Sequence, residues 1–345
     1  MPNTIIIDVL GYTLSDEEIT LLKHPEVAGL LLFTRNILNR AQLSQLIQSI
    51  RAIRPELILM IDHEGGYVQR IQRHGFTPLP AALNYGEVFD LNSEAGCRYA
   101  HQKGYTMAQE LLSCGIDLSL APVLDLHHPD SPIIGQLNRA FHQDPAHVTT
   151  LASAFIQGMH DAGMPAVGKH FPGHGSCLGD SHLTVPINNK SIEDLQSTDL
   201  KPFTDLIKAD VLDGIMPAYV LYPSIDPHHA AGYSAHWLRK ILRDDLHFNG
   251  LVISDCLGMK GADIGDLPSR AQQALEAGCD LLIVANQTRH DLFHCLEHLP
   301  PAKDPLREAR FESFRSKIKT QSLSPESFID TPQVEVEGYN RTLSV

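Results

Sequence analysis

Short apolar runs alternate with longer amphipathic segments along most of the chain. Each run is rich in Val, Ile, Leu or Ala and carries few charges before its C-terminal end, which is typical of a strand buried on both faces. These runs predict eight strands, at residues 5–9, 28–33, 57–61, 117–122, 166–169, 214–216, 251–254 and 280–284.

Helical patterns fill the intervals between these runs. Within residues 38–53 the apolar positions recur at spacings of three and four residues and form one apolar face. Similar patterns predict helices at about residues 94–112, 145–161, 192–209, 235–246 and 268–277. Because strands and helices alternate, we predict a parallel sheet, and eight strands favour a single (β/α)8 TIM-type barrel over an open sheet.

One barrel with insertions accounts for most of the 345 residues. We expect a single catalytic domain over residues 1–321. The periodicity is lost after Gln321, so residues 322–345 are expected to form an irregular C-terminal tail.

Composition and charge narrow the class of partner. Hydrophobic residues make up 43% and charged residues 20% of the chain, as in ordinary globular proteins. A formal net charge of −14 repels nucleic acid and anionic membranes, so neither is expected as a partner. The six cysteines form no C-x-x-C pair, and the N-terminus does not resemble a signal peptide. We therefore expect a reduced, cytoplasmic protein. We also expect a monomer whose partner is a small-molecule substrate.

Polar residues gather where three of the predicted strands end. Asp62, Lys169 and Asp255 each lie at such an end. In a parallel barrel, functional groups cluster at the C-terminal ends of the strands. A helix cap is the structural alternative for either Asp62 or Asp255, but polar residues at three strand ends fit that alternative poorly.

The segment KHFPGHGSCLGDSH, residues 169–182, is the richest in chemistry. Its glycines favour a mobile loop that closes over the barrel mouth. Asp180 lies two residues before His182, close enough to orient the imidazole and favour its protonated form. Such a histidine is suited to general acid/base catalysis, the alternative being a turn cap beside a surface histidine. The spacing matches no common zinc pattern, so no metal is expected.

These residues resemble the single-domain, cytoplasmic bacterial β-N-acetylhexosaminidases of glycoside hydrolase family 3. The K-H-F-P-G-H-G…D-S-H block is the most specific part of the match. The resemblance extends over most of the chain, through residues 8–11, 29–36, 61–66, 68–70, 121–125, 139–141, 169–175, 180–182, 253–255 and 277–280.

The resemblance implies a retaining exo-β-N-acetylglucosaminidase that needs neither metal nor organic cofactor. It implies that Asp255 is the nucleophile and that His182 is the acid/base, assisted by Asp180. It further implies a role in cell-wall recycling, with removal of N-acetylglucosamine from 1,6-anhydro-N-acetylmuramic acid fragments with or without peptide. The residues implied to hold the sugar are Asp62, Arg70, Arg139, Lys169 and His170.

A charge argument accompanies these roles. Asp255 must be ionised to attack, so Lys169 and Arg139 are expected to lie near it and lower the pKa of its carboxyl. Histidine as the acid/base avoids placing a second anion beside Asp255.

The chain departs from the family pattern at several positions. Cys256 stands where a second acid is usual, His63 where Gln is usual, Tyr67 where Arg is usual and Tyr219 where His is common. These departures leave the preferred leaving group open. Three alternatives also stay open: a β-N-acetylglucosaminide phosphorylase, a non-catalytic sugar-binding protein on the same fold, and a metal-dependent barrel hydrolase.

Overall fold

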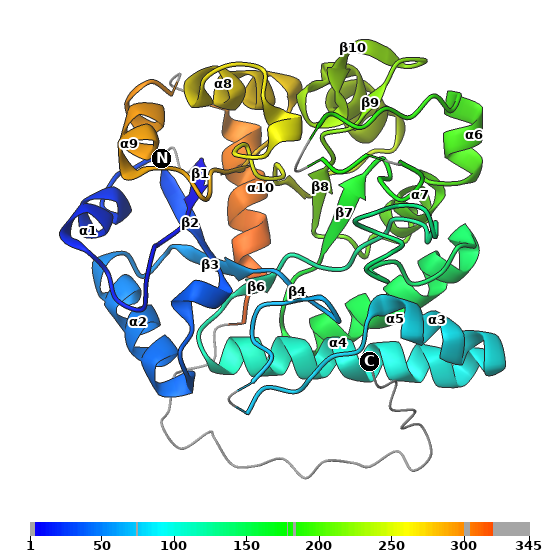
Figure 1. The fold of residues 1–345 in the computed structure, drawn as a ribbon, viewed down its shortest axis with the longest axis horizontal. Helices are drawn as coiled ribbons and strands as arrows, with labels where there is room; N and C mark the ends of the chain where they lie inside the picture. Colours follow the sequence, from blue (N-terminus) through cyan, green and yellow to red (C-terminus); the bar gives the residue numbers. More distant parts are fainter. Residues whose placement is uncertain (1–3, 74, 178, 182–183, 300–303, 320–345) are drawn as a thin grey trace.

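The computed structural model describes residues 4–73, 75–177, 179–181, 184–299 and 304–319. Eight parallel strands occupy its centre in two sheets (Figure 1). The five-stranded sheet has the order β12 (Leu282–Ile283), β1 (Ile5–Ile7), β2 (Val27–Leu32), β3 (Ile58–Ile61), β6 (Leu118–Ser119). The three-stranded sheet has the order β11 (Leu251–Val252), β8 (Gly214–Pro217), β7 (Val167–Phe171).

Isolated parallel bridges join the edges of the two sheets. One pairs Val123 with Lys169, and the other pairs Ile253 with Leu281. The strands therefore follow one another in chain order around a curled parallel sheet. All eight predicted strands are present, and the predicted α/β class with a parallel sheet is confirmed.

Helices surround the sheets (Figure 1). They are α1 (Asp16–Leu22), α2 (Arg40–Ile53), α3 (Ala82–Leu91), α4 (Ser93–Ser113), α5 (Pro145–Ala162), α6 (Ile192–Ser197), α7 (Lys201–Lys208), α8 (Leu267–Ala277), α9 (Arg289–Glu297) and α10 (Pro305–Ser316), with short helical turns η1 (Thr34–Asn36), η2 (Ala231–Tyr233) and η4 (Lys260–Ala262) and a π-helical segment η3 (His236–Asp245). Two short hairpins lie outside the main sheets, β4 (His63–Gly65) with β5 (Val68–Gln69), and β9 (Leu221–Tyr222) with β10 (Asp226–Ala230).

The prediction of one helix over residues 192–209 is wrong. Two helices, α6 and α7, occupy this segment. The helix is interrupted at Thr198, whose φ of −126° and ψ of −102° are not helical. Pro202 lies in the first turn of α7, where its missing N–H costs nothing. The break places Asp199 in the interior, where it forms an ion pair with Lys190.

Apolar side chains form two layers because strand residues alternate in direction. One set, including Ile6, Met60 and Ile283, lies inside the curled sheet, and the opposite set packs against the helices. Phe311 and Phe314 of α10 belong to the inner cluster. Helix α10 thus buries apolar surface against the strands themselves rather than among the outer helices.

Three acids lie directly before strands and tie neighbouring strands together. Asp117, Asp213 and Asp280 each accept a backbone N–H from the preceding strand of the sheet, at 2.7, 2.7 and 2.8 Å. Each also pairs with cations: Asp117 with Arg51, Asp213 with Lys317, and Asp280 with Arg243 and Arg310. Asp213 also lies 2.7 Å from Nε2 of His160. These contacts fix the strand starts, and the opposite ends carry the polar residues predicted above.

A search of the helices within the described ranges finds none with the length and apolar character needed to cross a membrane.

Candidate active site

Lys169 on β7 lies at the centre of a buried ionic cluster. Its Nζ is 3.1 Å from Asp62 Oδ1 and 2.6 Å from Glu64 Oε1, and its side chain is 3% exposed. Arg139 holds Glu64 with two hydrogen bonds of 2.8 Å, and Arg70 contacts the outer oxygen of Asp62 at 3.1 Å. The fold thus brings four of the five predicted sugar-holding residues together with Glu64, which was not among the predicted site residues.

The charges in this cluster stabilise one another. Burial alone would raise the pKa of Glu64, but Arg139 and Lys169 outweigh it and hold that pKa well below its usual range. Burial is likewise outweighed at Asp62, where Lys169 and Arg70 lower the pKa. Both carboxylates are therefore ionised at neutral pH. With three cations to two anions, the cluster carries a net positive charge of one and offers N–H donors to a polar ligand.

Glu64 is a residue that the sequence analysis did not single out as functional. Glu64 is the third residue after the predicted strand that Asp62 directly follows. Its position near a strand end was therefore the available signal. What the sequence could not show is that its side chain, rather than that of Asp255, takes both Arg139 and Lys169.

The expectation that Lys169 and Arg139 lie near Asp255 stays a prediction, because the ion pairs of both cations are with other acids and do not test it. Within the described ranges, both cations form ion pairs with acids that follow β3 and neither forms one with Asp255. The two cations satisfy Glu64 because all three groups are buried, and an unpaired buried carboxylate would be far more costly.

His170 is held by a second acid that the sequence analysis did not predict as a site residue. Its Nδ1 lies 2.7 Å from Asp125 Oδ2, and Asp125 is fully buried. Burial raises the pKa of Asp125, but His170 more than offsets it, so the pKa lies below its usual value. The carboxylate accepts a hydrogen bond from Nδ1–H, which leaves Nε2 as the nitrogen available to a ligand.

Asp255 follows β11 and remains partly exposed. Its Oδ1 accepts the backbone N–H of Cys256 at 2.7 Å. The hydroxyl of Tyr219, which is fully buried, donates to the Asp255 carbonyl at 3.3 Å. The thiol of Cys256 points to the carbonyl of Ala285 at 3.5 Å. The carboxylate end of Asp255 is thus oriented by its own strand-end turn.

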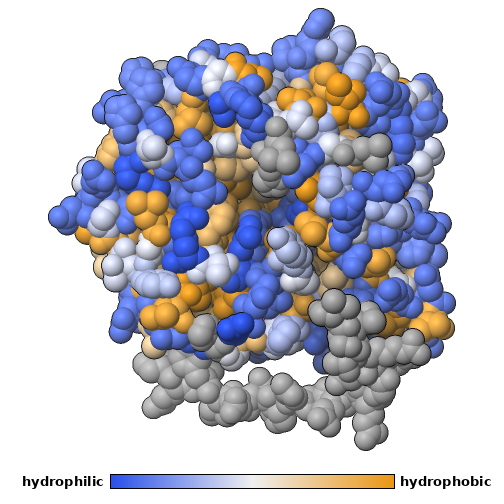
Figure 2. Space-filling view, viewed as in Figure 1, coloured by the Kyte–Doolittle hydropathy of each residue, from blue (hydrophilic) through white to orange (hydrophobic). Residues whose placement is uncertain are grey.

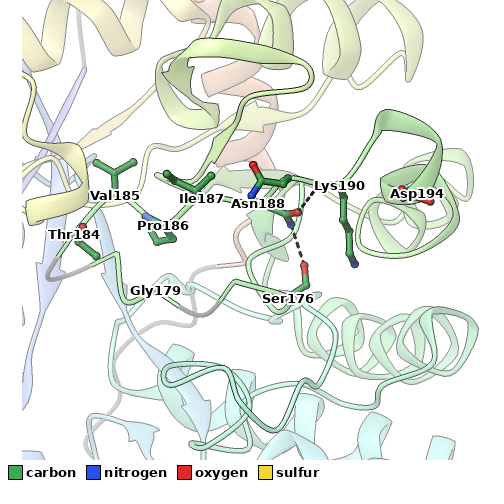
Figure 3. A pocket seen from close by; sticks show the side chains of 10 residues that line it. Ser176, Gly179, Thr184, Val185, Pro186, Ile187, Asn188, Lys190 and Asp194 are labelled. Atoms are coloured by element: carbon green, nitrogen blue, oxygen red, sulfur yellow. Dashed lines mark hydrogen bonds between the residues drawn. The ribbon is translucent and has the colours of Figure 1, made fainter.

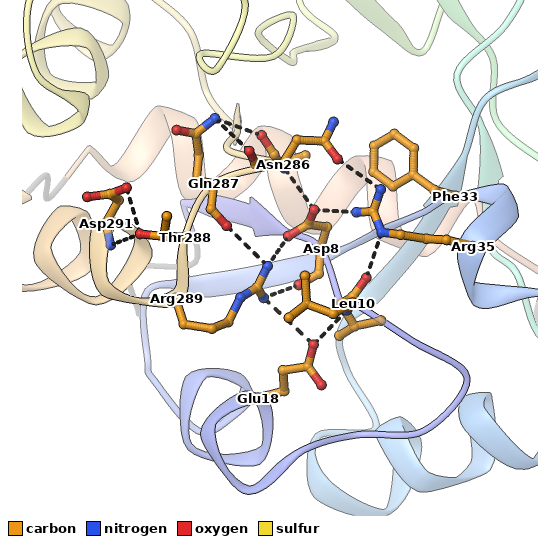
Figure 4. A network of polar contacts seen from close by, with 12 residues as sticks. Asp8, Leu10, Glu18, Phe33, Arg35, Asn286, Gln287, Thr288, Arg289 and Asp291 are labelled. Carbon is orange, nitrogen blue, oxygen red and sulfur yellow. Dashed lines mark hydrogen bonds and ion pairs between the residues drawn. The ribbon is translucent and has the colours of Figure 1, made fainter.

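A network around Asp8 supports this side of the site (Figure 4). Asp8 accepts hydrogen bonds from Arg35 at 2.5 Å, from Arg289 at 2.7 Å and from the backbone N–H of Asn286 at 2.7 Å. Asn286 directly follows Ala285, whose carbonyl accepts the Cys256 thiol. The network therefore fixes the segment against which Cys256 packs.

The structure describes one residue of the predicted acid/base pair, Asp180. His182 lies outside the described residues. Asp180 is half-buried, and its carbonyl accepts the N–H of Thr184 at 3.0 Å.

A cavity of about 660 Å³ lies beside this segment, and Figure 3 shows Val185, Ile187 and Lys190 among the side chains that line it. Seen from the side of Figure 1, the molecular surface is hollowed near its centre and carries many hydrophilic side chains (Figure 2).

A metal site would need a different cluster. Among the described residues, Asp90, His142 and His147 bring potential ligand atoms within 4.8 Å of one another. However, Nδ1 of His142 accepts the Asp144 N–H at 2.8 Å, so Nε2 carries the proton and donates it toward Asp90. The group lies around the outer helices α3 and α5, and the protonated nitrogen is unsuited to bind a cation.

These features define an α/β enzyme whose acids, cations and histidine converge at the carboxyl edge of a parallel sheet, a place suited to a hydroxyl-bearing substrate. Comparison with known proteins specifies the class. Residues 5–318 match the model of the glycosyl hydrolase family 3 N-terminal domain. The chain therefore belongs to glycoside hydrolase family 3, and it is a glycoside hydrolase of the β-N-acetylhexosaminidase type.

Individual relatives agree with this assignment. The chain is 46% identical over 310 residues to a β-hexosaminidase of Bordetella avium, covering 89% of this chain and 87% of the relative. It is 48% identical over 299 residues to that of Pasteurella multocida, covering 86% and 83%. Its fold is similar to the crystal structure of NagZ from Neisseria gonorrhoeae in complex with N-trifluoroacetyl-D-glucosamine, with a TM-score of 0.86, 37% identity and coverage of 93% and 91%. The chain is thus a NagZ-like β-hexosaminidase.

Proposed function

We propose that this chain is a retaining exo-β-N-acetylglucosaminidase that removes terminal N-acetylglucosamine from peptidoglycan fragments during cell-wall recycling. The substrates are N-acetylglucosaminyl-1,6-anhydro-N-acetylmuramic acid and its peptide-bearing forms. The observation that carries this proposal is the partly exposed Asp255 at the end of β11, on the same edge of the sheet as the buried cluster of Asp62, Glu64, Lys169 and Arg139.

The cluster supplies what recognition of a terminal sugar requires. The carboxylate oxygens of Asp62 accept hydrogen bonds from sugar hydroxyls. The side chains of Arg70, Arg139 and Lys169 donate hydrogen bonds to ring substituents. His170, held through Nδ1 by Asp125, presents Nε2 to the same ligand. Because the ionic partners are already paired and largely buried, the binding groups are ordered before the sugar arrives.

The chemistry proceeds in two displacements. In the first, a carboxylate oxygen of Asp255 bonds to the anomeric carbon while the bond to the leaving oxygen breaks, and protonated His182 gives that oxygen its proton. In the second, neutral His182 takes a proton from water, whose oxygen attacks the anomeric carbon and releases Asp255. Asp180 keeps His182 in the orientation that both steps need.

The proposal extends to the whole chain. We take the two joined sheets as one complete (β/α)8 barrel, formed by residues 1–321 and followed by a C-terminal tail at residues 322–345. The enzyme acts in the cytoplasm as a monomer without a metal or organic cofactor, where cell-wall fragments taken up by the cell would reach it.

Trapping the glycosyl-enzyme tests the mechanism. An activated, fluorinated N-acetylglucosaminide forms the ester with Asp255 but hydrolyses slowly, so digestion and mass spectrometry should place the sugar on the peptide containing Asp255. Labelling of any other residue contradicts the assignment of the nucleophile.

Two further measurements separate the alternatives. If turnover requires phosphate and yields the sugar 1-phosphate, the enzyme is a phosphorylase rather than a hydrolase. If a chromogenic N-acetyl-β-glucosaminide is not cleaved at any pH from mildly acidic to neutral, the chain is a sugar-binding protein instead.

A further inference from the structure

The helical turn η4, which begins five residues after Asp255, contacts the loop that carries the proposed acid/base pair. The N–H of Gly261 donates to the carbonyl of Ser181 at 2.8 Å. Ser181 is 2% exposed and lies between Asp180 and residue 182. This contact joins the segment after the proposed nucleophile to the segment of the proposed acid/base.

No side chain fits at the point of contact. A Cβ on Gly261 would lie 2.6 Å from the carbonyl oxygen of Ser181 and 3.0 Å from that of Thr184. Both neighbours are backbone atoms, which cannot rotate away as a flexible side chain can. The close approach of the loop to η4 therefore depends on a glycine at this position.

The other side of η4 is tied to the nucleophile strand through two buried tyrosines. The hydroxyl of Tyr233 donates to the carbonyl of Ala262 at 2.8 Å. The ring of Tyr233 packs on that of Tyr219 with centroids 4.9 Å apart, and the hydroxyl of Tyr219 reaches the Asp255 carbonyl. Tyr233 is 4% exposed and Tyr219 is fully buried, so this path has little room to shift.

The segment between Asp255 and η4 is also short and internally bonded. The N–H of Leu257 donates to the Ile283 carbonyl of β12, and the N–H of Met259 donates back to the Cys256 carbonyl. Both Leu257 and Met259 are buried. The turn therefore moves with the strand ends rather than with the loop.

From these contacts we propose that Gly261 is a positioning residue, and that its bare backbone holds Ser181 and Thr184 against the turn that follows Asp255. This inference rests on the proposed roles of Asp255 and His182. Gly261 does not touch the reacting atoms; it fixes the residues that flank the proposed proton donor in the chain.

A selective kinetic defect follows from such a role. Adding a methyl group at Gly261 pushes the loop off η4 while leaving Asp255 on its strand. Loss of proton donation slows departure of a poor leaving group, such as a second sugar, far more than that of an activated aryl group, which needs little protonation. A general folding defect would lower both rates together.

The test compares Gly261→Ala with the wild type on a disaccharide substrate and on an activated aryl N-acetylglucosaminide, using kcat/KM because it reports the first displacement. We expect a fall of about 10- to 100-fold for the disaccharide and less than about 3-fold for the aryl substrate. The rate of labelling by the fluorinated, activated sugar should also change by less than about 3-fold.

The control is Gly11→Ala, the same change at a glycine where an added Cβ meets nothing within 4 Å. It should leave both substrates at wild-type rates. Equal losses on both substrates, or no loss on the disaccharide, overturn the positioning role of Gly261.

Two further variants make the result decisive. If Gly261→Ala does not fold, Tyr233→Phe removes the hydroxyl that holds Ala262 without changing the packed volume, and it must shift the substrate ratio in the same direction. His182→Ala separates the inference from the function beneath it. A selective His182→Ala with an unselective Gly261→Ala defeats only the inference, whereas an unselective His182→Ala defeats the proposed function.

Discussion

His63 shows how one buried side chain affects the protein's response to pH. It is 1% exposed, and its Nδ1 has no hydrogen-bond partner among the described residues. Burial, helped by the nearby Arg70 cation, lowers the pKa of His63 to about 4. The folded protein therefore keeps this ring neutral at pH values where an exposed histidine is protonated.

The shifted pKa of His63 predicts a loss of stability in acid. Between pH about 6.5 and about 4 the unfolded chain binds a proton at His63 and the folded chain does not, so the free energy of unfolding falls as the pH falls. His63→Gln, which removes the titrating ring, should retain roughly 2–3 kcal/mol more of its neutral-pH stability at pH 4 than the wild type does.

Urea unfolding of both proteins at pH 7 and at pH 4 measures this difference. Parallel losses in the two proteins would show that His63 is not responsible. His174, whose pKa is also lowered to about 4 by burial, is present in both proteins and cancels in the comparison.

At Asp255, the proposed nucleophile, the geometry predicts an effect on activity without an effect on folding. Asp255→Asn keeps the size of the side chain and an oxygen that can accept the Cys256 N–H. Because an amide cannot form the glycosyl ester, kcat on an aryl N-acetylglucosaminide should fall by roughly three or more orders of magnitude. An unchanged thermal midpoint is the control. Activity within about tenfold of wild type contradicts the assignment.

At the scale of elements, the strands are tied at their starts by buried acids. Asp280 is 1% exposed, accepts the N–H of Val252, and pairs with Arg243 and Arg310. Asp117 and Asp213 occupy the same place before β6 and β8. Each acid thus connects two strands to cations on flanking elements, which fixes the register at the end opposite the active site.

Removing the charge of Asp280 should strongly destabilise the protein. Asp280→Asn removes the anion that pairs with Arg243 and the nearer of the two that pair with Arg310, in a largely buried site. We expect a loss of about 3–5 kcal/mol in the free energy of unfolding. The matched control is Asp245→Asn, which breaks the exposed pair with Lys240 and should cost less than about 1 kcal/mol. Chemical denaturation of both variants measures the two losses. Similar losses would contradict this role of the strand-start acid.

At the scale of the whole molecule, α10 is part of the core although it comes last among the described helices. Phe311 and Phe314 pack with the residues inside the curled sheet, and Phe314 reaches Gly214 at the start of β8. The chain end that follows has a different composition and, by our proposal, lies outside the catalytic domain.

Two truncations test this division. A chain ending at residue 304 lacks α10, exposes the inner apolar cluster and should fail to fold or lose most of its thermal stability. A chain ending at residue 321 keeps α10 and should match the full-length protein in thermal midpoint and in kcat/KM. A large loss of stability in the chain that ends at residue 321 would show that residues 322–345 belong to the fold.

Local patterns in the sequence predicted the strands and the main helices because burial imposes a periodicity that needs no knowledge of neighbours. The α6–α7 break was missed although the sequence carried a signal: Leu195 and Leu200 are five residues apart, and Pro202 is suited to the first turn of a new helix. Helix α10 was also missed, because its apolar face is defined by the strands it covers.

The sequence by itself determined the class of protein, the order of strands and helices, and the segments where chemistry gathers, since strand ends and the K-H-F-P-G-H-G…D-S-H block are local in the chain. Only the tertiary structure decided which charges meet. Lys169 and Arg139 pair with Glu64, Asp125 holds His170, and the N–H of Gly261 donates to the Ser181 carbonyl. These partners lie 45 to 105 residues apart in sequence. The pairing of the charged groups is set by burial, because a buried charge without a nearby partner is too costly to keep.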